Sequence, residues 1–176
     1  MRSKKGFEAS QIFVFVVSII VVGLVLLFGT RAIMNWREDL RQVNYVQFKT
    51  DLQNAIDDVA ADYGSVKQLD FHVPSDYQHV CFADMRFPMP ADRELVIDGV
   101  PYPEIKDAWT DSPPTANIFL LDENSARENF KDDRVQVPAN PTNSDLHIVC
   151  IPRENGNFKV RLEGMGRSVK VSRWHS

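Results

Sequence analysis

The chain has 176 residues, a net charge of −4 and an apolar content of 44%. This length suits one ordinary domain and leaves little room for a second. Charge is spread unevenly, because residues 31–176 hold 17 Lys and Arg against 23 Asp and Glu, a net of −6. Such an acidic body argues against a nucleic-acid-binding protein and against a domain that lies on an anionic membrane surface.

The most apolar segment lies near the N-terminus. From Ala9 to Thr30, 22 consecutive residues carry no charge. A helix of this length spans about 33 Å, which matches a hydrocarbon core about 30 Å thick. Helices buried in soluble proteins seldom have apolar runs longer than about 14 residues. We therefore predict a basic tail over residues 1–8 and a transmembrane helix over residues 9–30, with the lipid bilayer as its partner.

The span is expected to remain as an anchor. A cleaved secretory signal has a shorter apolar region that ends in small residues, whereas this run ends at Phe28-Gly29-Thr30-Arg31. Arg2, Lys4 and Lys5 precede the span and an acidic domain follows it. This arrangement favours a single-pass protein of the cell membrane with a cytoplasmic N-terminus and an extracytoplasmic domain.

Helical spacing continues beyond the span. The apolar positions of this stretch are Ile33, Trp36, Leu40, Val43, Phe48, Leu52, Ile56, Val59 and Tyr63. Their spacing predicts an amphipathic helix over residues 31–64 with one apolar stripe, ended by Gly64. The stripe is expected to pack on the chain's own domain, and a second interpretation adds contact with neighbouring subunits.

The rest of the chain, residues 65–176, has the alternation typical of strands. The predicted strands are Leu69–Val73, His79–Phe82, Leu95–Ile97, Val100–Tyr102, Asn117–Leu121, Leu146–Ile151, Phe158–Glu163 and Val169–Ser172. Asp98-Gly99 and Asn155-Gly156 predict tight turns. Residues 86–115 are expected to be mostly irregular.

The last three strands are expected to form an antiparallel C-terminal meander, and residues 125–130 a helical turn. The predicted fold class is α+β, with a long N-terminal transmembrane and amphipathic helix packed on a small antiparallel β-sheet domain.

Cys81 and Cys150 are the two cysteines of the chain. An even number in an exported domain favours a disulfide, which would close a loop of about 70 residues and contribute roughly 4 kcal/mol. Two free buried thiols are one alternative. A zinc site made with His79 and His147 is another, although His147 and Cys150 point to opposite faces of a regular strand.

The sequence contains no motif of a known catalytic class. We find no phosphate-binding loop, no His-Glu-x-x-His, no Gly-x-Ser-x-Gly and no Cys-x-x-Cys. The pairs Asp57-Asp58 and Asp132-Asp133 are most simply interpreted as acidic residues on solvent-exposed faces. A cation site is the alternative. We therefore predict a protein that is not an enzyme and that has no cofactor, no metal site and no nucleic-acid partner.

Lys4-Lys5-Gly6-Phe7 followed by an uncharged helix resembles the prepilin-type signal of type IV pilins and pilin-like proteins. The resemblance implies cleavage between Gly6 and Phe7 on the cytoplasmic side and a helix that becomes a filament spine. The family usually has Glu at the fifth position after the cut, where this chain has Gln11. Glu8 stands at the second position, so the resemblance assigns any assembly role to Glu8.

The chain also looks similar to uncharacterised single-pass membrane proteins of archaea, which supply no activity. The similar segments are Gln11–Phe15, Asp51–Asn54 and Val80–Asp84, with the final Ile151–Gly164 run. Two hypotheses follow. The first is a membrane-anchored structural or interaction protein of the cell envelope with a protein partner. The second is a pilin-like subunit that self-associates through its N-terminal helix.

Overall fold

The computed structural model describes residues 5–89, 94–111, 113–139 and 146–174. Its chain divides into two compact units, Met1–Val43 and Asn44–Ser176. The first unit is helical, and the second combines helix with mainly antiparallel sheets. This composition confirms the predicted mixture of a long N-terminal apolar helix with antiparallel strands.

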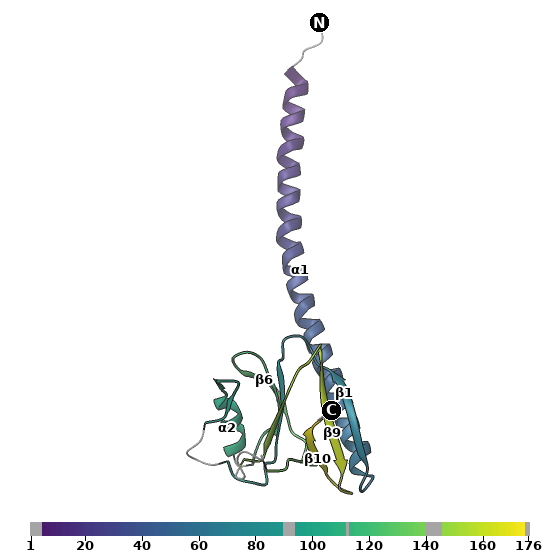
Figure 1. The fold of residues 1–176 in the computed structure, drawn as a ribbon. Coiled ribbons are helices and arrows are strands. Elements are labelled where there is room, and N and C mark those ends of the chain that lie inside the picture. Colours follow the sequence, from purple (N-terminus) through teal and green to yellow (C-terminus); the bar gives the residue numbers. More distant parts are fainter. Residues whose placement is uncertain (1–4, 90–93, 112, 140–145, 175–176) are drawn as a thin grey trace. The chain divides into compact units, whose positions relative to one another are not determined.

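The first helix, α1, runs from Lys5 to Ala60 (Figure 1). Its segment Ile12–Arg31 has a mean hydropathy of 3.2, and none of the segment is buried within the structure. The segment is long and apolar enough to cross a membrane. Within the described part of the chain, the side chains of this segment are exposed.

The C-terminal part of α1 belongs to the second unit and supplies one wall of its core. Phe48, Leu52, Ile56 and Val59 are buried there, at the i, i+4, i+8 and i+11 positions of one helix face. Val43 and Tyr63 of the predicted stripe are not part of this face, because they are 60% and 77% exposed. Ile33, Trp36 and Leu40 lie outside the residues whose side chains are described. α1 ends at Ala60, before Tyr63, and Gly64 follows with a left-handed φ of 82°.

Eight strands form two sheets, which we call sheet A and sheet B. Sheet A has the order β1-β9-β10-β7, from Val66–His72, Asn157–Gly164, Val169–Arg173 and Val135–Gln136. Sheet B has the order β6-β5-β2-β8, from Ala126–Phe130, Ile118–Leu121, His79–Ala83 and Ile148–Pro152. A separate hairpin pairs β3 (Val96–Ile97) with β4 (Val100–Pro101).

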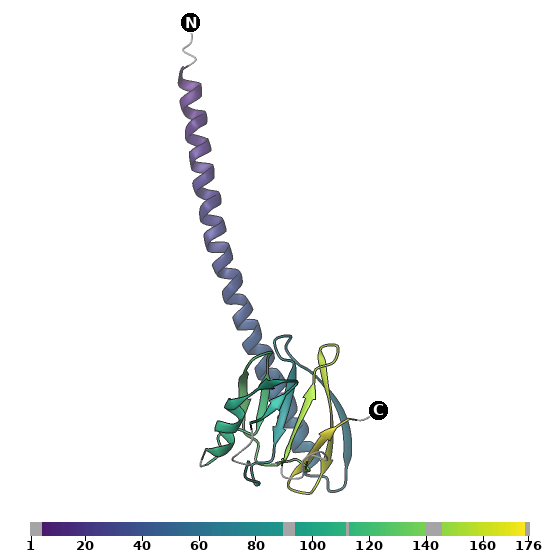
Figure 2. The ribbon, with the colours of Figure 1, turned by 60° about the vertical axis from the view of Figure 1, so that its left-hand side comes forward.

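Sheet B is buried on both faces. Val80 and Phe82 of β2 point into a core shared with α1 and sheet A. Cys81 and Ala83 of the same strand point into a second core, which the β3–β4 hairpin and helix α2 (Pro103–Thr110) cover. Figures 1 and 2 show α2, sheet B and sheet A side by side in that order. Double burial explains why β2 and β5 are continuous apolar runs.

Sheet A has one buried and one solvated face, as the alternation of β9 predicted. Phe158, Val160 and Leu162 are buried, whereas Lys159 and Arg161 between them are exposed. Both predicted tight turns are confirmed, because Asp98-Gly99 and Asn155-Gly156 all have positive φ between 51° and 88°.

The C-terminal meander differs from the prediction. β9 and β10 form the expected hairpin, but β8 pairs with β2 in sheet B instead of with β9. Only the bridge Glu154–Asn157 joins β8 to β9 across the turn. The reason lies in burial, since β8 carries apolar residues on both faces and suits the doubly covered sheet. One pairing, β10 with β7, is parallel.

Two further elements differ from the sequence expectations. The predicted helical turn over residues 125–130 was wrong, because Ala126–Phe130 is strand β6 and pairs with β5. The region expected to be irregular contains α2. Its Pro103 stands at the start of the helix, and its buried Ile105, Ala108 and Trp109 have helical spacing.

Gly164 allows α1 to approach sheet A closely. A Cβ atom there would lie 2.2 Å from the carbonyl oxygens of Val59 and Asp62, so no other residue fits without movement of the backbone. The N–H of Gly64 donates to the Gly164 carbonyl, and the N–H of Gly164 donates to Ser65. The end of α1 is thereby bonded to the end of β9.

A buried carboxylate joins the two sheets at the end of β2. Asp84 accepts hydrogen bonds from the Arg86 guanidinium at 2.8 and 2.5 Å, and from the N–H of Val137 just after β7. Burial alone would raise the pKa of Asp84, but these hydrogen bonds and the charge of Arg86 outweigh it and hold the pKa below its ordinary value.

A second Asp-x-Arg arrangement follows β6. The Arg134 guanidinium donates to Asp132 and also pairs with Asp57 of α1. Asp132 is 5% exposed and exchanges two hydrogen bonds with Asn117, so the expectation that Asp132-Asp133 is a solvated face was wrong for Asp132. Burial raises the pKa of Asp132, and the neighbouring charge of Asp133 adds to this effect.

The core role of α1 predicts the cost of a truncated side chain. Leu52→Ala should lower the free energy of unfolding by about 2–5 kcal/mol, because it leaves a cavity between α1 and the sheets. The control Asn54→Ala, on the exposed side of the same helix, should change it by less than about 0.5 kcal/mol. Urea unfolding of the full chain in neutral detergent measures both, and equal losses would contradict this packing.

The lowered pKa of Asp84 predicts a pH dependence. A group whose pKa is lower in the folded protein stabilises the fold above its unfolded pKa of about 3.9, and this contribution is lost as the pH falls through the folded pKa. Asp84→Asn should therefore lower the urea midpoint at pH 7 and reduce its fall between about pH 4 and pH 2. The control is Asp70→Asn, at an exposed position of β1. A pH profile unchanged by Asp84→Asn would contradict the assignment.

Candidate functional site

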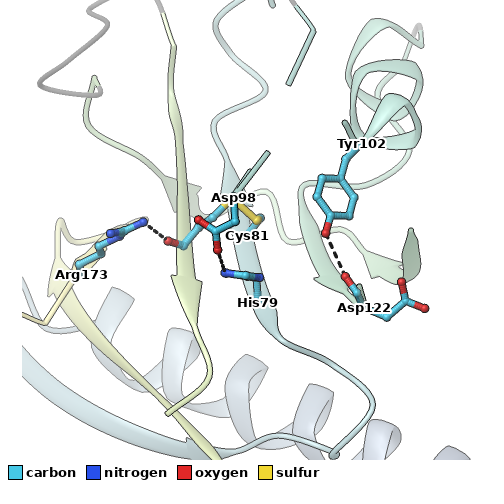
Figure 3. Close-up of a disulfide and its surroundings, with 7 residues drawn as sticks. His79, Cys81, Asp98, Tyr102, Asp122 and Arg173 are labelled. Carbon is cyan, nitrogen blue, oxygen red and sulfur yellow. Dashed lines mark hydrogen bonds and ion pairs between the residues drawn. A yellow bond between two sulfur atoms is a disulfide. The ribbon is translucent and has the colours of Figure 1, made fainter. Parts of the chain in front are cut away.

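The predicted disulfide between Cys81 and Cys150 is present (Figure 3). The two residues are directly opposite each other on the neighbouring strands β2 and β8, with their Cα atoms 4.0 Å apart. Both side chains point into the second core, under α2 and the β3–β4 hairpin. The bond closes a loop whose ends are 69 residues apart in the sequence.

This bond removes the two cysteine alternatives left open by the sequence. Neither cysteine is free, so neither offers a thiolate to zinc. His147 makes other contacts. Its ring stacks on Phe87, and its Nδ1 lies 3.1 Å from the carbonyl oxygen of Val137. Among the residues that the structure describes, no group of three or more His, Cys, Asp or Glu is placed to hold a metal ion.

Arg173 connects sheet A to the disulfide-bearing strand. Its Nη2 donates to the backbone carbonyl of Cys150 at 2.6 Å (Figure 3). β8 is an edge strand of sheet B, so this carbonyl is an acceptor that no further strand pairs. The guanidinium of one sheet thus satisfies a backbone group of the other.

His79 and Asp98 tie the β3–β4 hairpin to the start of β2. The Nε2 atom of His79 lies 3.0 Å from Oδ2 of Asp98, which stands in the tight turn of the hairpin (Figure 3). The His79 side chain is 12% exposed, and its Nδ1 is buried without a hydrogen-bond partner. His79 shares a face of sheet B with the disulfide, because it precedes Cys81 by two residues.

Beside this pair, a cleft of about 440 Å³ opens at one end of sheet B. Its lining residues come from the start of β2, the end of β8 and two turns: Tyr77, Gln78, His79, Asp98, Pro152, Arg153, Asn155 and Gly156. Arg153 is the cation of this lining. Its Nη1 donates to the carbonyls of Ser75 at 2.7 Å and Tyr77 at 3.3 Å, which fixes the position of the guanidinium.

The sequence did not single out the residues that meet at this cleft, apart from His79. Asp98 and Asn155 were recognised only as turn formers, and Arg153 carries no local pattern that would distinguish it from other surface arginines. The three predicted N-terminal residues, Gly6, Phe7 and Glu8, lie in the first turns of α1, and their side chains are outside the described ones. Their roles in processing and assembly stay predictions.

The disulfide predicts a large stability difference between the oxidised and the cysteine-free chain. Replacing both cysteines by alanine should lower the free energy of unfolding by about 4 kcal/mol, since the unfolded chain regains the freedom of a long loop. Urea unfolding of both forms in neutral detergent measures this difference. The intact mass of the oxidised protein should increase by two hydrogens on reduction, and an unchanged mass would contradict the bond.

Comparison of the chain with protein-family models, with curated proteins and with solved structures gives no match.

Proposed function

We propose that this chain is a single-pass, membrane-anchored protein of the cell envelope whose second unit acts outside the cytoplasm through a protein partner, without catalysis. The observation that carries the proposal is Ile12–Arg31, an apolar helix segment with no covering residues in the structure. An uncovered apolar surface of this length is stable in a bilayer and not in water, because lipid removes it from water while the helix pairs its own backbone groups.

The disulfide supports the location of the second unit outside the cytoplasm. Disulfides persist in oxidising compartments and are rare in the cytosol. Cys81 and Cys150 both lie after the span, so an oxidised pair requires the second unit to be on the oxidising side. The acidic charge of this part of the chain agrees, since it would be repelled by an anionic cytoplasmic leaflet.

The second candidate is a pilin-like subunit, favoured by Lys4-Lys5-Gly6-Phe7 immediately before the apolar segment. In this case the chain would begin at Phe7 after cleavage. The helix would leave the bilayer and pack against the same helix of other subunits in a filament. Glu8 would take the registering role. We place this candidate second because the carboxylate is at the second position after the cut.

Alkaline extraction and thiol labelling test the anchor and its orientation. The full chain, made in a bacterial inner membrane, should stay in the membrane pellet after carbonate treatment. A variant with Ile19→Lys and Val22→Lys should be released, because each charge at the bilayer centre costs about 2.5–3.5 kcal/mol. The matched control is Val43→Lys with Val46→Lys, two exposed positions beyond the span.

Orientation is read from the same membranes after denaturation with detergent. A maleimide reagent should label neither cysteine until reductant is added. Labelling of both without reductant would place the second unit in the cytoplasm and contradict the proposal. Intact mass separates the two candidates, since a start at Met1 supports the plain anchor and a start at Phe7 supports the filament subunit.

A further inference from the structure

We propose that the cleft at the end of sheet B binds a compact oxyanion, the carboxylate or phosphate group of a small molecule, through Arg153. This site goes beyond the membrane anchor and the protein partner proposed above. It belongs wholly to the second unit.

The charge of Arg153 has no ion-pair partner within the described part of the chain. Arg153 is partly buried in the cleft wall, and among the described residues no carboxylate lies within ion-pair distance of it. The hydrogen bonds of its guanidinium go to the two backbone carbonyls of Ser75 and Tyr77, both from Nη1. The remaining N–H groups of the guanidinium are left for a ligand, and a guanidinium binds planar carboxylate or phosphate groups through paired hydrogen bonds.

The turn between β8 and β9 lies next to Arg153 in the cleft lining. The β8–β9 turn has left-handed φ values of 52° at Asn155 and 88° at Gly156. Its two turn hydrogen bonds join Glu154 and Asn157 and leave the N–H groups of Asn155 and Gly156 outside the pair. Asn155 and Gly156 line the same cleft as Arg153, and backbone N–H groups of turns are known to supply donors to bound anions.

Asp98 is the acidic residue of the cleft lining. The Oδ2 atom of Asp98 lies 3.0 Å from the Nε2 atom of His79, and Asp98 forms no ion pair with Arg153. Glu123 accepts a hydrogen bond from the side chain of Gln78, another residue of the cleft lining. An anion at Arg153 would still be repelled by Asp98 across the cleft, which makes the affinity sensitive to this one residue.

The experiment uses the full oxidised chain in a neutral detergent at low salt and pH 7. Sodium phosphate and sodium acetate are titrated separately, and the ¹⁵N-detected shifts of the Arg153 side chain and of the Asn155 and Gly156 amides are followed. We expect saturable shifts with at least one anion. Phosphate alone, acetate alone or both would each support the site and would identify its preferred chemistry.

Two substitutions make the test specific. Arg153→Gln should weaken binding at least about tenfold, because it removes a charged donor from the anion. The matched control, Arg161→Gln on the exposed face of β9, should leave the affinity unchanged. Equal weakening by both substitutions, or no saturable shift in the unmodified chain, would overturn the proposal.

A second variant keeps the test valid where loss of the bonds to Ser75 and Tyr77 disturbs the fold. Asp98→Asn keeps a hydrogen-bond acceptor for His79 and suits the left-handed backbone of the turn. It should tighten anion binding about two- to fivefold, since it removes the repelling charge. Unchanged or weaker binding by a folded Asp98→Asn protein would overturn the proposal.

Discussion

The burial of sheet B on both faces is the constraint on which the second unit depends. Val80 and Phe82 need one apolar partner layer, and Cys81 and Ala83 need another. A chain of this size meets both needs only by recruiting elements that are far apart in sequence. The end of α1 and sheet A cover one face, and α2 with the β3–β4 hairpin covers the other. The disulfide, the His79–Asp98 contact and the cleft all lie on the second face or at its edge.

Polar contacts at the margins hold these layers in register. Asp84 joins the end of β2 to the segment after β7, Arg134 joins α1 to the β6–β7 loop, and Arg173 joins sheet A to the backbone of β8. Each contact joins a charged side chain of one element to a polar partner on another element. Apolar burial brings the layers together without direction, whereas these contacts specify which residues face each other.

Local patterns predicted the local structure well, and long-range pairing limited the rest. The apolar segment of α1 and the turns at Asp98-Gly99 and Asn155-Gly156 were readable because a few neighbouring residues decide them. β6 was misread because Ala126–Phe130 has little strand propensity of its own and is extended by pairing with β5. β8 was placed in the wrong sheet because adjacency in sequence was taken for adjacency in space. The cleft was missed because Arg153 becomes distinctive only when Ser75 and Tyr77 position it.

The covalent link between β2 and β8 has a consequence for the integrity of the protein. Every element from β3 to β7, including α2, lies in the loop between Cys81 and Cys150. One break of the backbone anywhere in this loop would leave the two fragments joined through sulfur. β9 and β10, which follow Cys150, would stay attached to the helix that precedes Cys81. The two fragments of a cleaved chain would therefore stay covalently joined, and attached to α1, until a reductant reached the disulfide in the second core.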